Sequence, residues 1–410
     1  MMRNLFRSIF AGATRSPREK LPSADGYPSV IPDLQSTAAE RGWNYRRARP
    51  SSIQSCQPSM TIAEESLDRL RSGPAYLRPT PNARSPETIE RAELYYSHLS
   101  ASTRYPIGET FICEVPQAIL AAPAGVIFTA DSELLLQSSF DRSIASRAIL
   151  PPSPLDLPGR WLSLLSLFTV KSNYAHWLMD SLPKLSLLDP SDHNFKVIIP
   201  AHPASFIIDS LRLLGIESDR ILEMPATGLR VETLIFSHAA QRSGVPSAPH
   251  LLALRERLLQ SATGQTFSPS PSKRLYISRA RSARAIVNEL ELLPILRDFG
   301  FDSVFGEDLD FPSQIRLFSE ANVIAGAHGA GIFNHLFCNQ ESTVVEIFNR
   351  DWWDHAPRKL ATLLNHRHWH LFGKSMGATH TTQVDPRRLS KLLTYALTSL
   401  ESSQTHDSSY

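Results

Sequence analysis

The chain has 410 residues, too many for one ordinary hydrophobic core, so two domains with flanking segments are expected. Its 42% hydrophobic and 20% charged residues are typical of a globular protein, and a formal net charge of +2 argues against a nucleic-acid partner. Three widely separated cysteines exclude a disulfide framework and a zinc-ligand pattern, and they favour a reducing compartment.

Residues 1–106 are predicted to be largely irregular, because Pro, Ser and Arg are frequent there and hydrophobic periodicity is weak. Two helices are expected within this region, at Ile62–Arg71 and Pro86–Tyr96. Met1–Phe10 joins basic residues to a short apolar patch, which fits a leader without fixed structure or an amphipathic helix in peripheral contact with a membrane. With no secretory signal and no run of about 20 apolar residues, the sequence predicts a cytoplasmic protein, with any membrane contact at the inner face.

A first domain is expected at residues 107–262, where short apolar runs alternate with Pro, Gly and Asp. A β-rich lead-in comes first, with strands at 111–115, 125–129 and 133–137. After the Pro-rich hinge 150–154, alternating strands and helices indicate parallel βαβ units. The predicted elements are an apolar run at Trp161–Thr169, helices at Tyr174–Leu188 and Ala204–Leu214, and strands at 196–200, 220–222 and 233–236.

A second domain is expected at residues 273–384, after the linker Ser261–Ser272, and a helix at 385–401 precedes a polar tail. Asn288 and Glu291 form a capping-box pattern at the start of a helix that Gly300 ends. Strands are predicted at 274–278, 303–305, 322–326 and 343–348, and a further helix at Pro312–Glu320. The predicted fold class is therefore α/β, with two Rossmann-like domains facing a cleft.

A glycine turn provides the first candidate site. The strand at 322–326 runs directly into His328-Gly329-Ala330-Gly331, and an apolar helical run containing Asn334 follows. Small residues let a diphosphate approach the backbone, and a helix N-terminus offers N–H groups and a favourable dipole. His328 can also donate to a phosphate or a leaving oxygen. The alternative is a tight βα turn without a ligand.

Two arginines, Arg279 and Arg284, follow the strand at 274–278, and Asn288 and Glu289 come just after them. Open α/β sheets bind ligands at the carboxyl ends of their strands, and the planar guanidinium group suits oxyanions. The pattern therefore predicts donor-binding residues. Two solvated loop arginines are the alternative.

His176 and Asp180 are four residues apart in the motif Asn173–Asp180, so a helix would place them on one face. Such a pair either supplies a base that deprotonates an acceptor hydroxyl or stabilises a buried helix. Glu346 emerges from an apolar strand and needs hydrogen-bond donors, which ribose hydroxyls or a neighbouring loop can supply.

Three alternating histidines, His366, His368 and His370, would share one face of a strand, as metal ligands can. No cysteine or carboxylate stands directly beside them at ligand spacing. A site without a metal or other cofactor is therefore preferred.

Together these residues resemble glycosyltransferase family 61, whose bacterial members are often labelled capsular polysaccharide biosynthesis proteins. The resemblance covers about Phe111 to Phe372. Its motifs, in chain order, are Asn173–Asp180, Tyr276–Arg279 with Arg284 and Asn288-Glu289, Phe311–Gln314, Ala327–Gly331 with Asn334, and Val345–Ile347. Ala175 departs from the family, which commonly has an aromatic residue before the histidine.

The resemblance implies a GT-B-like fold and an inverting, metal-independent transfer from a nucleotide sugar to a hydroxyl of a glycan or other acceptor. Asn173 and Tyr174 would lie on the acceptor side, and His176 or Asp180 would be the catalytic base. The second domain would hold the donor through Arg279, Arg284, Asn288, Glu289, His328, Gly329, Ala330, Gly331, Asn334 and Glu346.

Two other functional classes remain as alternatives. One is a non-catalytic nucleotide- or glycan-binding protein on the same fold. The other is an NAD-dependent oxidoreductase, against which stands the lack of a G-x-G-x-x-G motif after the first strand of either domain.

Overall fold

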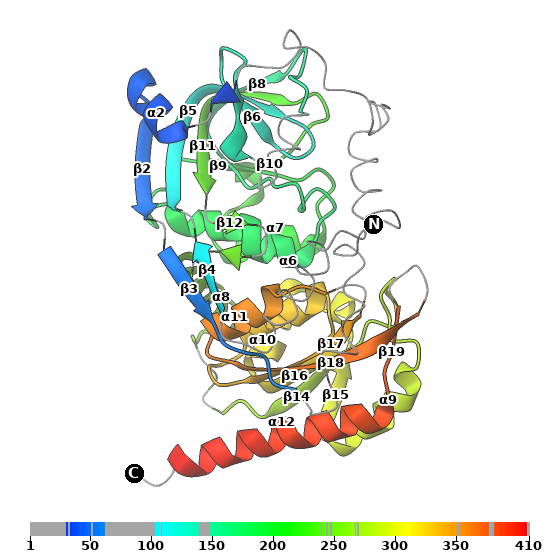
Figure 1. Ribbon diagram of the computed structural model, residues 1–410. Helices are drawn as coiled ribbons and strands as arrows, with labels where there is room; N and C mark the ends of the chain where they lie inside the picture. The colour runs from blue at the N-terminus through cyan, green and yellow to red at the C-terminus, as the bar shows by residue number, and fades with distance from the viewer. Residues whose placement is uncertain are drawn as a thin grey trace, which may run out of the picture.

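The computed structural model describes residues 30–31, 33–50, 52–61, 103–107, 109–138, 148–238, 240–242, 245–246, 248–266, 268, 270–350, 353–376 and 381–407. These residues form a mixed α/β protein with two large β-sheets, one in each half of the molecule (Figure 1). The helices predicted at Ile62–Arg71 and Pro86–Tyr96 lie outside the described residues. Among the helices described, none is long and apolar enough to cross a bilayer.

The first sheet is mixed, with strand order β1-β7-β6-β5-β11-β8-β9-β10 and with β2 also paired to β5. The predicted parallel pattern is confirmed for β8, β9 and β10, whereas β5 pairs antiparallel with β2, β6 and β11. The strands are β1 (Val30–Ile31), β2 (Asn44–Arg49), β5 (Thr110–Ala121), β6 (Val126–Phe128), β7 (Leu134–Leu135), β8 (Leu155–Ser163), β9 (Lys196–Ile199), β10 (Ile221–Glu223) and β11 (Leu229–His238). The shorter elements of this half are η2 (Leu136–Ser138), α7 (Ser205–Leu213), η5 (Ser218–Arg220), β12 (Ala240–Arg242) and β13 (Val245–Pro246).

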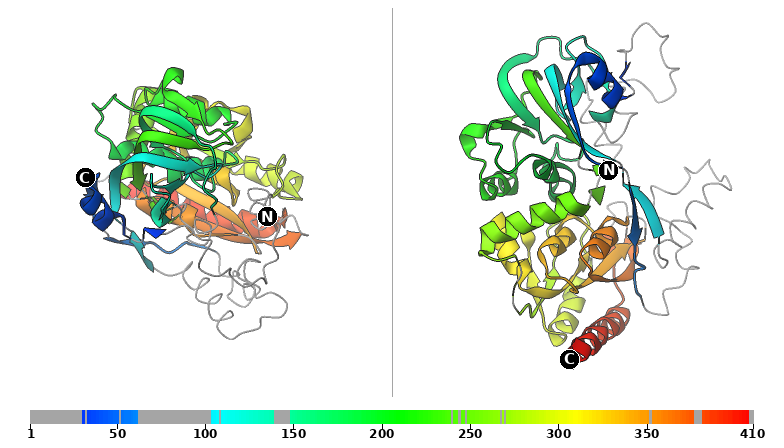
Figure 2. Two further views of the ribbon diagram at one scale, coloured as in Figure 1. Left: turned by 90° about the horizontal axis from the view of Figure 1, so that it is seen from above. Right: turned by 90° about the vertical axis from the view of Figure 1, so that its left-hand side faces the viewer.

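The prediction of a largely irregular N-terminal region is wrong for residues 34–49, 52–56 and 103–107, which form a helix and strands. Helix α2 (Leu34–Arg41) is capped by Asp33, which accepts from two backbone N–H groups, and β2 then joins the first sheet. Strand β3 (Ser52–Cys56) pairs with β4 (Thr103–Ile107) along one side of the molecule (Figure 2). Met60 then forms a β-bridge to Trp369 of the second sheet. These strands pair with partners far away in sequence, so local periodicity could not reveal them.

The second sheet has strand order β15-β14-β16-β17-β18-β19, and every pairing is parallel except that of β18 with β19. Its elements confirm the predicted alternation, and α12 continues past the predicted end at residue 401 to Asp407. The strands are β14 (Lys273–Ile277), β15 (Phe301–Val304), β16 (Ala321–Ala327), β17 (Thr343–Asn349), β18 (Arg367–Met376) and β19 (Thr381–Gln383). The helices are α9 (Glu289–Asp298), η6 (Gly306–Asp308), α10 (Phe311–Ser319), η7 (Ala330–Phe337), α11 (Ala356–Leu363) and α12 (Pro386–Asp407).

This strand order creates a topological switch point beside β14. The chain leaves β14 for β15 on one side and returns to β16 on the other. The loops after β14 and β16 therefore depart in different directions at the carboxyl edge of the sheet. Open α/β sheets bind their ligands in the crevice that such a divergence leaves.

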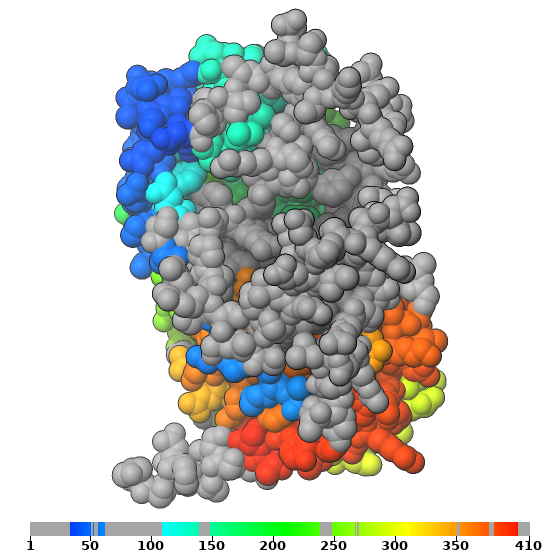
Figure 3. Space-filling model, in the orientation of Figure 1, coloured from blue at the N-terminus to red at the C-terminus, as the bar shows by residue number. Residues whose placement is uncertain are grey.

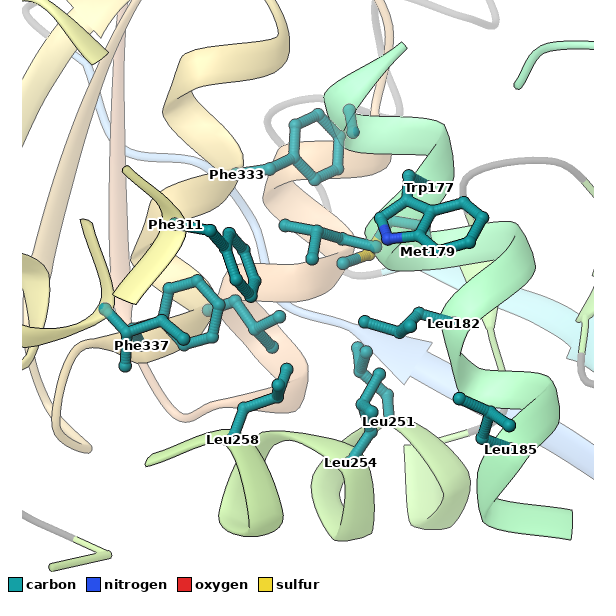
Figure 4. Close-up of a cluster of buried hydrophobic side chains, with 14 of the residues drawn as sticks. Trp177, Met179, Leu182, Leu185, Leu251, Leu254, Leu258, Phe311, Phe333 and Phe337 are labelled. Carbon is teal, nitrogen blue, oxygen red and sulfur yellow. The ribbon is translucent and has the colours of Figure 1, made fainter. Parts of the chain in front are cut away.

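The two halves share one apolar core. Side chains from η3 (Trp177–Ser181), η4 (Leu182–Leu187) and α8 (Ala248–Thr263) of the first half meet α10 and η7 of the second half (Figure 4). The single helix predicted at Tyr174–Leu188 is wrong in detail: α6 (Tyr174–His176) passes into the π-helical turn η3 and then into the 3₁₀ segment η4. Pro183 explains part of this, because it has no N–H group for an α-helical bond.

Candidate active site

Arg279 and Gly329 bring the two diverging loops into contact. A Cβ atom added to Gly329 would lie 1.5 Å from Nη1 of Arg279, so the guanidinium group needs a glycine at this position. Arg279 Nε donates to Ser282 Oγ at 3.2 Å, and among the described residues no carboxylate lies within ion-pair distance of the guanidinium group. The terminal guanidinium nitrogens thus face the glycine turn.

A second cation, Arg284, adds to the positive charge of this loop. Burial and, to a smaller extent, the nearby charge of Arg284 lower the pKa of Arg279 to about 10, against the opposing charge of Glu307. Burial also lowers the pKa of Arg284, against the opposing charge of Asp354. Both guanidinium groups stay charged at neutral pH, and their mutual repulsion would be relieved by a bound anion.

The glycine turn presents backbone donors at the same place. His328 donates its N–H to the carbonyl of Ile347 at 2.8 Å, which fixes the end of β16 against β17. The first hydrogen bond of η7 runs from Ile332 N to Gly329 O, at 3.3 Å. The N–H groups of residues 329–331 therefore precede the first bonded turn, as at other helix N-termini that bind anions.

His328 is a cation at this turn. Its Nδ1 lies 2.7 Å from Oε1 of Glu346, and its Nε2 lies 3.6 Å from Oδ2 of Asp354. Burial acts against the charged imidazole, but Asp354 and Glu346 outweigh burial and raise the pKa of His328 to about 9. Although desolvation opposes it, His328 in turn holds the pKa of Asp354 well below its usual range. Asp354 has a half-exposed side chain and no motif around it, so sequence reasoning missed it as a site residue.

Several of the predicted donor-binding residues make hydrogen bonds within the protein, among them Glu346, Glu289 and Asn288. Glu346 has no exposed side-chain surface, and its two oxygens accept from His328 Nδ1 and, at 2.9 Å, from His368 Nε2. Glu289 accepts from the hydroxyls of Tyr276 and Ser278, at 2.7 and 2.8 Å. The structure therefore gives Glu346 and Glu289 supporting contacts, and it leaves Glu346 no exposed oxygen for a ribose.

Asn288 is also engaged within the protein. It stands at the N-cap position of α9, but its side chain makes no capping bond, so the predicted capping box does not form. Its Nδ2 instead donates to Val384 O at 2.8 Å and to Glu291 Oε2 at 3.1 Å, and its Oδ1 accepts from Val384 N at 3.0 Å. Asn288 thus ties the start of α9 to the segment that leads into α12.

His176 and Asp180 form the pair that their spacing predicted. Nδ1 of His176 lies 2.8 Å from Oδ2 of Asp180, and the imidazole stacks on Phe168 at 4.6 Å between ring centroids. Asn173 caps α6 by accepting from His176 N at 3.3 Å. The carboxylate has no exposed surface, whereas 28% of the His176 side chain is exposed. Because Nδ1 faces the carboxylate, Nε2 is the ring nitrogen that carries the lone pair in the neutral imidazole.

A hydrogen-bond chain joins the His176 helix to the glycine turn. Tyr174 donates to Asn334 Oδ1 at 2.5 Å, and Asn334 Nδ2 donates to Gln314 Oε1 at 3.1 Å. Gln314 in turn donates to the carbonyls of Gly306 and Leu309, each at 3.1 Å. Asn334 is buried, so its contacts connect α6, α10 and η7 and thereby the two halves of the molecule.

The three alternating histidines at the start of β18 are buried and contact other side chains. Nδ1 of His366 lies 3.1 Å from Nδ1 of His335, while His368 and His370 both lie beside Ser59. Across the part of the chain that the structure describes, no group of three or more His, Cys, Asp or Glu residues is arranged to hold a metal ion.

Residues 174–345 match the family model described as Glycosyltransferase 61. The matched region begins at Tyr174 and includes both arginines and the glycine turn, while Ser59, Glu346 and His368 lie outside it. No curated protein matches the chain.

Proposed function

We propose that this glycosyltransferase, a member of family 61 by the domain at residues 174–345, moves a sugar from a nucleotide-sugar donor to a hydroxyl of a glycan acceptor. The reaction inverts the anomeric centre and uses no metal. The two halves act as the domains of a GT-B-like enzyme, with the donor held by the second half. Polysaccharide biosynthesis in the cytoplasm is the proposed setting.

The observation that carries the donor proposal is the contact of Arg279 with Gly329 at the switch point of the second sheet. Arg279, Arg284 and the N–H groups of residues 329–331 surround the position for a diphosphate. Charged guanidinium donors stabilise the negative charge that develops on the departing phosphate oxygen. His328 supplies a third positive charge there, so the cations of the chain take the part that a divalent ion has in other transferases.

On the acceptor side, His176 is the proposed base and Asp180 its positioning residue. Nε2 of His176 takes the proton of the acceptor hydroxyl, and the hydroxyl oxygen attacks the anomeric carbon from the face opposite the diphosphate. The bond from that carbon to the phosphate oxygen breaks, and the nucleotide leaves as an anion held by Arg279 and Arg284. Asp180 stabilises the imidazolium that forms, since its carboxylate faces Nδ1 at 2.8 Å.

Product analysis tests this reaction. The protein is incubated with UDP-, GDP-, dTDP- and CMP-sugars and a panel of oligosaccharide acceptors, and proton NMR follows the anomeric configuration of donor and product. One donor class should give a product of inverted configuration, at a rate that EDTA leaves unchanged. A retained configuration or a rate abolished by EDTA would contradict the mechanism, and binding of a donor without any transfer would favour a non-catalytic protein.

A further inference from the structure

A line of buried hydrogen bonds connects the glycine turn to the N-terminal segment. Ser59 Oγ lies 2.7 Å from Nδ1 of His368 and 2.7 Å from Nδ1 of His370. Nε2 of His368 lies 2.9 Å from Glu346, and the other oxygen of Glu346 lies 2.7 Å from Nδ1 of His328. Each of these five side chains is buried.

Backbone pairing fixes the position of Ser59 in this line. Met60 donates its N–H to His368 O at 2.8 Å and accepts from His370 N at 2.9 Å, so it extends the edge of the second sheet beside β18. Thr61 adds a bond from its hydroxyl to His370 O, also at 2.8 Å. In Figure 3 the blue residues of this N-terminal segment lie on the orange surface of the second half.

The direction of each bond follows from which atoms can donate. An ionised carboxylate only accepts, so the contact with Glu346 requires a proton on Nε2 of His368. In the neutral ring Nδ1 then accepts, and its donor is the Ser59 hydroxyl, which lies 2.7 Å from this nitrogen and 3.3 Å from its other acceptor, the carbonyl oxygen of His368. The oxygen of Ser59 accepts in turn from Nδ1–H of His370, which is neutral because burial lowers its pKa well below the usual value. One hydroxyl therefore sets the tautomers of two histidines.

We infer that Ser59 is a positioning residue of the donor site: its hydroxyl holds His368 as the Nε2–H tautomer, which keeps Glu346 directed at His328 beside the glycine turn. This role rests on the proposed function only in naming that turn as the donor site. It makes residues 52–61 part of the site, although they lie more than a hundred residues before the region that matches the family.

The charge of His328 depends on this arrangement. The groups that face it are Glu346 from β17 and Asp354 from the loop after β17, with Arg279 and Arg284 on the loop after β14. Beyond Glu346 lie His368 and His370 of β18. Without the Ser59 hydroxyl, the proton of His368 can move to Nδ1, and a lone pair then faces Glu346. The carboxylate loses the hydrogen bond from His368 and its negative charge is less well compensated, so it holds the proton of His328 more strongly.

Ring nitrogen NMR of the full chain, labelled with ¹⁵N-histidine, is the first test. The wild type should show His368 protonated at Nε2 and His370 protonated at Nδ1, with assignments from His368→Gln and His370→Gln. The opposite tautomer of His368 would overturn the inference without any need for a Ser59 variant.

The second test follows the His328 ring through a pH titration in Ser59→Ala. Its pKa should rise from about 9 by about one pH unit, the equivalent of one buried hydrogen bond that Glu346 no longer accepts from His368. The matched control is Thr61→Val, which removes a hydroxyl from the same segment outside the line and should leave the titration unchanged. In a His368→Gln background the amide group donates to Glu346 and has no tautomers. There Ser59→Ala should leave the pKa of His328 unchanged.

A folded Ser59→Ala protein with an unchanged His328 titration would overturn the inference, and so would an equal shift in Thr61→Val. None of these measurements uses a substrate, so they stand apart from the transferase assay. If the titrations agree with the prediction but the protein binds no nucleotide sugar, the role of Ser59 is supported. Only the proposed function is then contradicted.

Discussion

The guanidinium group of Arg279 occupies the space that a side chain on Gly329 would fill, with Nη1 only 1.5 Å from the position of a Cβ atom. The two residues follow neighbouring parallel strands, β14 and β16, whose connections diverge. The glycine is therefore required by the arginine as well as by the turn. The close approach of backbone and guanidinium group concentrates N–H donors at one point, where a diphosphate would receive several of them at once.

Gly329→Ala should weaken nucleotide binding about as much as loss of the arginine, because the new methyl group displaces the guanidinium group. We expect a loss of about 10-fold or more, the equivalent of one charge-assisted hydrogen bond. Isothermal titration calorimetry with the nucleotide that the transferase assay releases measures this change in affinity. Gly306→Ala is the matched control, since its Cβ would meet Gln314 only at 3.9 Å. Equal affinities in Gly329→Ala and wild type would contradict the contact.

His176→Gln should lower kcat by about 10²–10⁴-fold, the usual contribution of a general base, while donor affinity stays close to that of the wild type. Asp180→Asn should lower kcat too, because the amide keeps the contact with Nδ1 but loses the charge that stabilises the imidazolium. Initial rates and donor titrations on both variants separate these effects, with the exposed His193→Gln as control. Loss of donor binding in His176→Gln would refute its assignment to the acceptor side.

Tyr174→Phe should destabilise the protein, because it leaves Oδ1 of the buried Asn334 without the donor that lies 2.5 Å away. A buried acceptor that loses its partner costs about 1–3 kcal/mol. Urea unfolding should show a lower midpoint at unchanged slope. Tyr395→Phe, on the half-exposed face of α12, provides the comparison and should unfold like the wild type.

His328 should make stability depend on pH. Its folded pKa of about 9 is above the usual 6.5, so its contribution is fully present below pH 6.5 and is lost as pH rises through 9. The contribution is of the order of 2–4 kcal/mol. Urea unfolding of wild type and His328→Gln at pH 6.5, 8 and 9.5 measures it, and the difference between the two proteins should shrink as pH rises. A difference that is constant over this range would contradict a charged His328.

The second sheet could be predicted well because its signals are local. Continuous apolar runs such as 322–326 and 343–348 mark buried parallel strands, and Pro312 marks the first turn of α10. The order of those strands brings Arg279 to the glycine turn, so two separate motifs become one site. The pairing of His176 with Asp180 also follows from spacing alone.

The side-chain partners within the site could not be predicted, because they depend on contacts between residues far apart in the sequence. Glu346 looked like a ribose ligand, but its partners His328 and His368 come from elements that only the folded sheet brings together. Ser59 is one serine in a region rich in serine and proline, and only its bridge to β18 gives it a role. Asp354 lies in a loop without a pattern, and its proximity to His328 is visible only in three dimensions.

Nucleotide binding by wild type and Arg279→Ala tests the central claim most directly. A thermal-shift screen against UDP, GDP, CMP and dTDP sugars should raise the melting temperature of the wild type with one nucleotide class, because a ligand that binds the native state stabilises it. Arg279→Ala should bind that class about 10–100-fold more weakly. The neighbouring Arg281→Ala, whose guanidinium group pairs with Asp308 at 2.6 Å instead, should respond like the wild type. Equal shifts in the wild type and Arg279→Ala, or no shift with any nucleotide sugar, would contradict a donor site at the glycine turn.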